Sequence, residues 1–304
     1  MSTSVTNGAG VSMRVDHAGL MLLLGAIWGA SFLFMRVASP EFGPTGLIFV
    51  RLVIASLLLG SIVAIQGRTK ELFQNPVQMI ILGLTSSAIP FSLFAYATLS
   101  LSAGFASVLN ATAPFFGALI GVLVLRDSLT RQQWIGLLIG FVGVCILVWD
   151  KLDWRGSAVS VAACLVAAFL YGFSAHFSKR KLSHVHPVVV ATSSQIAASL
   201  AMIPIAWMTW PSQVPSTTSW LAALMLGGLC TGIALAIYFP LLHSIGPTRT
   251  MTIAYLIPMF GVMWGAWFLK ESISASILAG GSLILSGLVC VTWSATPVLL
   301  PTEE

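Results

Sequence analysis

The chain of 304 residues is 57% hydrophobic and only 8% charged, whereas a soluble domain carries about 25% charged residues. Its apolar residues form long runs, each close to the roughly 20 residues that cross a bilayer core, and this excludes a water-soluble globular domain. The formal net charge of +5 lies in short segments between these runs, without the basic clusters and interleaved aromatic residues that a nucleic-acid-binding protein needs.

Ten apolar segments follow one another along the chain, and each is long enough to cross a membrane as a helix. We therefore expect an all-α integral membrane protein with ten transmembrane helices. Residues 1–17 are expected to form a flexible cytoplasmic N-terminus and residues 295–304 a cytoplasmic tail. The connecting segments are short, with Arg36–Pro44, Gln66–Pro76 and Trp210–Ser219 among the longest, so consecutive helices should be antiparallel neighbours. The predicted spans are Ala18–Met35, Thr45–Ile65, Val77–Leu99, Ala103–Leu125, Trp134–Trp149, Gly156–Ser178, Pro187–Met208, Trp220–Leu242, Thr248–Leu269 and Ala275–Trp293.

Lysine and arginine residues are distributed unequally between the two sets of connecting segments. With the N-terminus inside the cell, the cytoplasmic set holds nine of them and the opposite set four. Cytoplasmic loops of membrane proteins carry the excess of these residues, so both termini are predicted to be cytoplasmic. The cytoplasmic set is Arg14, Arg68, Lys70, Arg126, Arg131, Lys179, Arg180, Lys181 and Arg249, and the opposite set is Arg36, Lys151, Arg155 and Lys270.

Residues 18–150 and 151–294 are predicted to be two copies of one unit, because short motifs recur between them at an offset of 143 or 144 residues. Each unit holds five spans, an odd number, so the second enters the membrane from the opposite side. Such inverted repeats are typical of secondary transporters, whose substrate site lies between the halves near the membrane midplane. The recurring pairs are Ile27–Phe32 with Leu170–Ala175, Leu82–Gly83 with Leu226–Gly227, Phe94 with Tyr238, Ala113–Gly117 with Ile257–Gly261, and Leu125–Leu129 with Leu269–Ile273.

The opening and the ending of each unit also resemble a known family. Trp28–Phe32, followed in the second span by Val50–Leu52, is similar to the start of the repeat in the EamA family of the drug/metabolite transporter superfamily. Arg126–Leu129 before a glycine-rich fifth span is similar to the family's repeat ending, and Lys270–Ile273 is the second copy. The resemblance covers about residues 18 to 294. In one departure, the second half has Ser194 and Gln195 where the first has Arg51.

This resemblance implies a ten-helix fold in a bacterial inner membrane. It also implies a protein that exports small metabolites, often amino acids, by alternating access. Within the family, the chain is most similar to the bacterial aromatic amino acid exporters. No cofactor and no metal site is implied, and the partners expected are a small-molecule substrate and the lipid bilayer. An intramembrane enzyme is the alternative from another class, but the chain has no His-Glu-x-x-His zinc motif and no intramembrane aspartate pair.

All nine acidic residues lie in the termini, the connecting segments or the ends of spans. Proton and sodium coupling usually uses an ionisable side chain at membrane depth, so facilitated diffusion or exchange is favoured. A proton-coupled exporter of drugs or purine-like metabolites remains the alternative, because His176 and His243 near span ends could titrate close to neutral pH. The acidic residues are Asp16, Glu41, Glu71, Asp127, Asp150, Asp153, Glu271, Glu303 and Glu304.

Arg51 is the one charge clearly inside a span, roughly 10 Å along its helix. Exposure to lipid would cost about 3 kcal/mol or more, so its side chain should face protein or a water-filled cavity. One interpretation is that it holds a substrate carboxylate or a gate. The other is structural, with the side chain reaching outward or bonding carbonyl groups of the first helix.

The fourth and ninth predicted spans carry matched prolines. Pro114 removes the backbone hydrogen bond to the carbonyl of Asn110, which predicts a polar spot beside the Asn110 amide. Pro258 should act in the same way on Ala254, with Tyr255 alongside. A packing kink satisfied by a neighbouring helix is the alternative for both.

Aromatic residues occupy repeat-matched positions, as a central cavity shared by the two halves would require. Together with nearby polar groups they form the candidate substrate pathway. Its members are Trp28, Ser31, Arg51, Phe94, Asn110, Pro114, Tyr171, Ser174, Gln195, Tyr238, Tyr255 and Pro258.

Spaced glycines mark the fifth and tenth spans, and they predict close helix contacts. These contacts could lie within the fold or at a subunit interface, so we expect a monomer or a weak homodimer. The glycines are Gly136, Gly140 and Gly143, then Gly280, Gly281 and Gly287.

Overall fold

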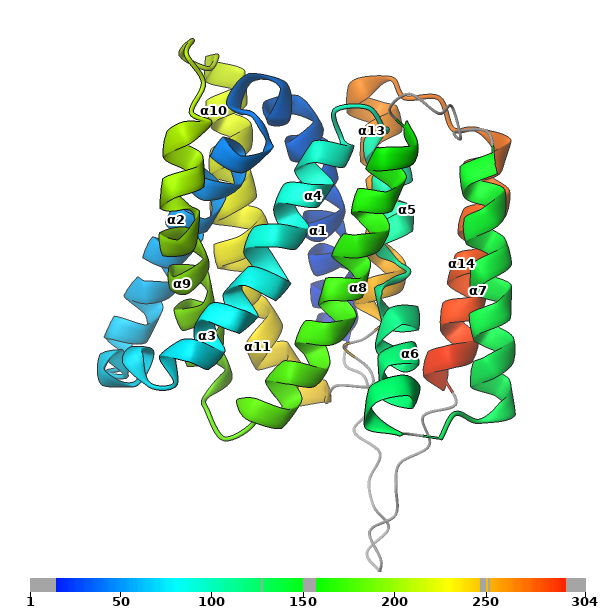
Figure 1. Ribbon diagram of the computed structural model, residues 1–304, viewed down its shortest axis with the longest axis horizontal. Coiled ribbons are helices and arrows are strands. Elements are labelled where there is room, and N and C mark those ends of the chain that lie inside the picture. Colours follow the sequence, from blue (N-terminus) through cyan, green and yellow to red (C-terminus); the bar gives the residue numbers. More distant parts are fainter. Residues whose placement is uncertain (1–14, 127, 150–156, 247–249, 251, 294–304) are drawn as a thin grey trace, which may run out of the picture.

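A computed structural model describes residues 15–126, 128–149, 157–246, 250 and 252–293 of the protein. Across these residues the secondary structure is helical, and the helices run between two opposite faces of one bundle (Figure 1). In chain order they are α1 (Val15–Phe42), α2 (Pro44–Ile65), the short 3₁₀ helix η1 (Thr69–Phe73), α3 (Pro76–Gly83), η2 (Leu84–Ala88), α4 (Ile89–Ala97), α5 (Ala103–Asn110), α6 (Ala113–Leu125), α7 (Arg131–Trp149), α8 (Ser157–Lys181), α9 (Pro187–Met208), α10 (Thr217–Leu224), η3 (Met225–Ile233), α11 (Ala234–Ile245), α13 (Ile253–Leu269) and α14 (Ala275–Trp293).

These elements form ten apolar crossings, which confirms an all-α membrane protein with two repeated halves. Nine described helices are at least 18 residues long and apolar enough to span a bilayer, and the described part of the ninth crossing, Ile253–Leu269, is shorter. Three crossings are composite, namely α3–η2–α4, α5–α6 and α10–η3–α11. We call the face where α1 ends the Glu41 face and the face where α8 ends the Lys179 face (Figure 1).

One predicted boundary was wrong. Arg36–Pro44 is not a connecting segment, because α1 continues to Phe42 and only Gly43 separates it from α2. Gly43 has a φ of 70°, a left-handed conformation that glycine adopts without strain, so one residue is enough to reverse the chain. The fourth crossing has the predicted ends, Ala103 and Leu125, but it is broken at Ala111–Thr112, so Asn110 ends α5 and Pro114 lies at the start of α6.

The two halves repeat one another in backbone detail as well as in sequence. Both contain a segment of wide π-helical turns, η2 in the third crossing and η3 in the eighth. A methyl group added to Gly83 would lie 2.3 Å from the carbonyl oxygen of Ser194, and one added to Gly227 would lie 2.8 Å from that of Arg51. Since Ser194 follows Arg51 by 143 residues, the same backbone contact is made once in each half.

The glycines of the fifth and tenth crossings lie between α7 and α14, which run side by side at the edge of the bundle (Figure 1). A methyl group on Gly136 would lie 2.7 Å from the carbonyl oxygen of Gly287, and one on Gly143 would lie 2.8 Å from that of Gly280. These glycines therefore pack helices within the fold.

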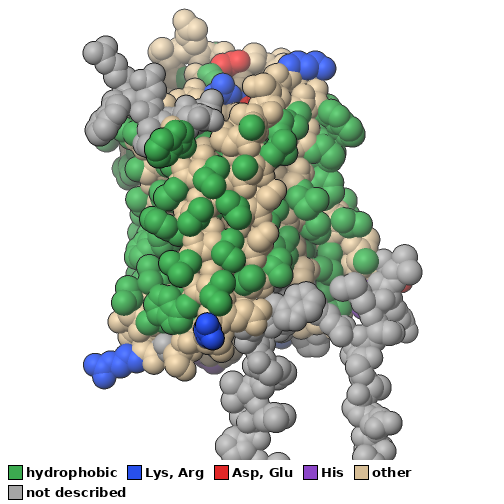
Figure 2. Space-filling view, turned by 90° about the vertical axis from the view of Figure 1, so that its right-hand side faces the viewer, with side chains coloured by type: hydrophobic (Ala, Val, Ile, Leu, Met, Phe, Trp, Pro, Cys, Tyr) green, Lys and Arg blue, Asp and Glu red, His purple; other side chains and the backbone are tan. Residues whose placement is uncertain are grey.

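The lateral surface suits a bilayer. Hydrophobic side chains cover the height of the bundle in Figure 2, and lysine and arginine side chains lie near its two ends. The only ion pair among the described residues joins Arg68 and Glu71 at 3.0 Å, on the Lys179 face. The core consists mainly of apolar side chains from both halves, such as Phe42, Phe94 and Leu226.

Candidate functional site

A central cavity of about 770 Å³ lies between the two halves. Residues of α1, α2, α3, η2, α4, α8, α9, η3, α11 and α13 line it, together with residues at the break between α5 and α6. Nine of the twelve predicted pathway residues line this cavity, namely Trp28, Ser31, Arg51, Phe94, Asn110, Pro114, Tyr171, Gln195 and Tyr238.

The cavity extends to one face of the bundle. Its lining includes Lys179, Ser183 and Pro187, which belong to the end of α8 and the start of α9 on the Lys179 face. Deeper in the bundle, the lining passes through Arg51 and Gln195 to Trp28. A small molecule could therefore enter or leave through the Lys179 face.

The opposite end is closed by a set of contacts that we call the Glu41 seal. Arg36 of α1 donates a hydrogen bond to the carbonyl oxygen of Thr98, just after α4. The Glu41 carboxylate accepts hydrogen bonds from the backbone N–H of Ser216, at 2.5 Å, and from its hydroxyl, at 2.9 Å. The ring of Phe42 contacts Trp220, with ring centres 4.8 Å apart, and Trp210 at 6.2 Å.

Two aromatic pairs face the cavity and are related by the internal repeat. The ring centres of Trp28 and Tyr238 lie 5.3 Å apart, and those of the matched residues Tyr171 and Phe94 lie 6.0 Å apart. Phe32 packs edge-on against Phe94 at 5.5 Å. Such walls suit a flat apolar or aromatic part of a ligand.

Arg51 is only 4% exposed, and the cavity is the space that its side chain faces. Its Nε–H donates to the Thr231 hydroxyl at 2.9 Å, and the guanidinium carbon lies 3.5 Å from the centre of the Phe91 ring. The Nη1 atom is buried and has no hydrogen-bond partner in the described part of the chain. Of the two interpretations of Arg51, this placement excludes a side chain that reaches out to the bilayer surface.

Gln195 occupies the corresponding place in the second half. Its Nε2–H donates to the Ser87 hydroxyl at 3.0 Å, while its Oε1 atom is buried without a partner among the described residues. Ser87 and Thr231 are separated by 144 residues and lie in η2 and η3, so the two bonds involve equivalent positions of the two repeats. Sequence reasoning missed both hydroxyls, although the repeat offset could have found them.

Three predicted pathway residues lie outside the cavity lining. The Ser174 hydroxyl donates to the carbonyl of Leu170 within α8, at 2.5 Å. The Tyr255 hydroxyl bonds Thr292 and the carbonyl of Leu288 on α14, and Pro258 is buried within α13. Each therefore has a packing role in this conformation.

His176 lies outside the described cavity lining. An Nε2 atom of His176 lies 2.8 Å from the carbonyl oxygen of Gly117, an arrangement in which the ring N–H donates. The side chain of His243 lies outside the described residues. His176 thus joins α8 to α6.

The described acidic residues lie at helix ends or in connecting segments and not in the cavity. Glu271 accepts hydrogen bonds from the backbone N–H groups of Ala103, at 2.9 Å, and Gly104, at 3.3 Å, at the start of α5. Asp127 lies outside the described residues. Among the described residues, no aspartate or glutamate belongs to the cavity lining, and no cluster of side chains could hold a metal ion.

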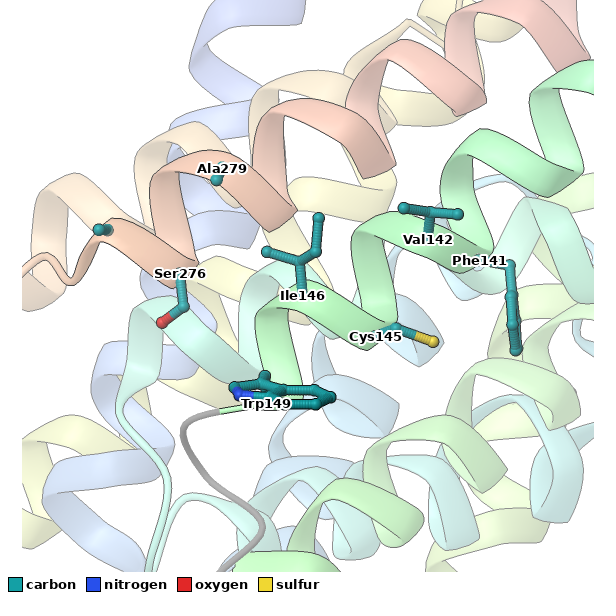
Figure 3. Close-up of a pocket in the computed structure, with 8 residues that line it drawn as sticks. Phe141, Val142, Cys145, Ile146, Trp149, Ser276 and Ala279 are labelled. Carbon is teal, nitrogen blue, oxygen red and sulfur yellow. The ribbon is translucent and has the colours of Figure 1, made fainter.

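A second hollow, of about 580 Å³, lies on the outside of the bundle between α7 and α14 (Figure 3). Its walls are almost entirely apolar, and Trp149 at one end is 79% exposed. Ser276 supplies the one side-chain hydroxyl there. This hollow lacks the polar groups that would fix a ligand, so the central cavity is the candidate site.

Comparison with known proteins agrees with this architecture. The EamA-like transporter family matches twice, over residues 18–149 and 158–293. A "probable amino-acid metabolite efflux pump" of Salmonella typhimurium is 26% identical over 88% of this chain and 92% of its own length. The inner membrane transporter YedA of Escherichia coli is 23% identical over 94% of this chain and 95% of its own length. One crystal structure, at 16% identity, superposes with a TM-score of 0.66 over 94% of this chain and 100% of that one, which shows a shared fold.

Proposed function

Because the chain belongs to the EamA-like transporter family, we propose that it is a secondary transporter that exports small metabolites across the bacterial inner membrane, with amino acids, aromatic ones first, as cargo. The observation that carries this proposal is a central cavity that reaches the Lys179 face and is closed by the Glu41 seal. A channel would need a path through both ends. A cavity open at one end is what alternating access requires.

The distribution of charges supports an orientation in the membrane. Arg68, Lys70, Arg126, Arg131 and Lys179–Lys181 gather on the Lys179 face, which we assign to the cytoplasm together with both termini. The described conformation is then open to the cytoplasm, ready to take up cargo for export.

The mechanism that we propose is facilitated diffusion or exchange. Across the part of the chain that the structure describes, the cavity lining holds no carboxylate, which supports a mechanism without coupling through a buried acid. The aromatic pairs Trp28–Tyr238 and Tyr171–Phe94 would enclose the side chain of an amino acid, and Arg51 would face its carboxylate.

The test is transport by purified protein in proteoliposomes, with radiolabelled amino acids and with or without a proton gradient. We expect flux down the substrate gradient without a proton gradient. Robust flux of another metabolite, with none of any amino acid, would refute the proposed cargo. Accumulation driven by a proton gradient alone would refute the uncoupled mechanism.

Three variants test the cavity as the pathway. Trp28→Ala, Asn110→Ala and Tyr238→Phe should lower flux at unchanged membrane abundance, with Trp28→Ala reduced about tenfold because it removes a buried aromatic wall. The matched control is Trp149→Ala, which removes an exposed tryptophan outside the bundle. Normal flux in all three cavity variants would place the pathway elsewhere.

A further inference from the structure

The charge inside the central cavity is unbalanced. Arg51 carries a permanent positive charge deep in the lining, and Lys179 adds another at the mouth. No aspartate or glutamate of the described residues lines the cavity to compensate them. A buried charge without a partner is unfavourable, so a bound anion would relieve an existing cost.

We propose that the cavity selects monocarboxylates by net charge, and that a ligand with a carboxylate but no ammonium group binds more tightly than the corresponding zwitterionic amino acid. This inference rests on the proposed function and names the feature of the cargo that the site recognises. Its preferred ligands are aryl carboxylate anions with a neutral N–H group. Amino acids remain ligands because they share the carboxylate.

The carboxylate end is assigned to Arg51 by geometry. Its Nε–H is held by Thr231 and its flat face by Phe91, so the guanidinium cannot turn freely. Nη1 is left as a buried donor without a partner in the described structure. A fixed, unpaired cationic donor gains most from a carboxylate oxygen, because such a bond is charge-assisted.

The nitrogen end is assigned to Gln195. Its Nε2–H donates to Ser87, and its buried Oε1 atom has no partner among the described residues, so we assign this acceptor to the ligand's N–H. One neutral acceptor satisfies a single amide N–H. An ammonium group has three donors and a full charge, and the described lining offers it no acidic partner while Arg51 repels it.

The flat part of the ligand fits the remaining walls. Trp28, Tyr238, Tyr171 and Phe94 form the two repeat-matched ring pairs. Their faces would attract a cation weakly, but the positive charge of Arg51 in the same cavity opposes its binding. The walls therefore set the ligand's shape, and Arg51 sets its charge.

The experiment measures binding to the full chain, purified in detergent, by isothermal titration calorimetry. Three ligands share one ring and differ in charge: N-acetylphenylalanine is an anion, phenylalanine a zwitterion and phenylalaninamide a cation. We expect affinity to fall in that order, with about tenfold or more between the anion and the cation. Equal affinities, a tighter cation, or no binding of any of the three would overturn the proposal.

Two variants assign the effect to the named residues. Gln195→Glu adds a negative charge to the same cavity and should remove most of the preference for the anion, and Arg51→Gln should do the same where the protein folds. Arg68→Gln, which changes an arginine at the surface, is the matched control and should keep the preference. An unchanged preference in Gln195→Glu would contradict the assignment.

Flux measurements keep this proposal separate from the proposed function. If the protein moves amino acids in proteoliposomes but binds the anion no better than the zwitterion, transport stands and the charge rule fails. If no substrate moves but the order of affinities holds, the site binds as described and the transport function fails.

Discussion

Arg36 in the first half and Lys179 in the second are separated by 143 residues and so occupy equivalent positions of the repeat. They lie at opposite faces of the bundle and have different surroundings. Arg36 donates to the carbonyl of Thr98 and helps to close the Glu41 face. Lys179 and Leu242, the residue that follows Thr98 by 144 positions, both line the open mouth on the Lys179 face. The matched helix ends differ too, since α4 stops at Ala97 while α11 continues to Ile245.

This difference predicts the contacts of the opposite conformation, in which the cavity opens to the Glu41 face. In an inverted repeat, the opposite-facing state arises when the two halves exchange conformations. The contact that closes the Glu41 face thus predicts the contact that closes the Lys179 face. We expect Lys179 to reach the Leu242 carbonyl, which now accepts from the backbone N–H of Gly246 within the last turn of α11, at 3.0 Å.

The largest expected effect concerns contacts that do not differ between the halves. Gly83→Ala and Gly227→Ala each place a methyl group against a backbone carbonyl, so the helices must separate and stability should fall by about 1–3 kcal/mol. Gly60→Ala, a helical glycine with nothing within 4 Å, is the control and should be neutral or stabilising. Melting of the purified protein measures this. If only one of the two variants lost stability, the two halves would not pack equivalently and the prediction would be wrong.

The next effect tests the exchange of the two seals. Lys179→Ala should lower proteoliposome flux roughly tenfold, because the outward-facing state loses a charge-assisted hydrogen bond. Lys181→Ala, two residues further along and exposed, should leave flux unchanged. Equal flux in the two variants would mean that the Lys179 face closes by other contacts.

Much of the fold could be predicted from the chain because membrane crossings and repeats depend on local composition. The length of apolar runs located the ten crossings, and the fixed offset related Trp28 to Tyr171 and Phe94 to Tyr238. Nine of the predicted residues then met at one cavity, since matched positions in inverted halves face a common axis. Their role in transport stays a prediction.

The rest could not be predicted because these helices are apolar on every side. In a bilayer, both the lipid-facing and the inward faces are apolar, so the pattern does not tell which way a helix is turned. Tyr255 was expected at the cavity, but its neighbour Ala254 lines it while Tyr255 bonds α14. The break at Ala111–Thr112 and the single-residue turn at Gly43 depend likewise on packing that no local pattern records.

The smallest effect concerns the closed face itself. Glu271, between α13 and α14, accepts from the backbone N–H groups of Ala103 and Gly104 and so ties that join to the first turn of α5. Glu271→Gln removes the charge from a helix N-terminus and should cost about 1 kcal/mol, seen as a lower melting temperature. Glu71→Gln breaks a partly exposed ion pair with Arg68 and should lower the melting temperature less. Equal shifts would mean that Glu271 contributes only as a surface charge, and that the Glu41 face is held by Arg36 and Glu41 without it.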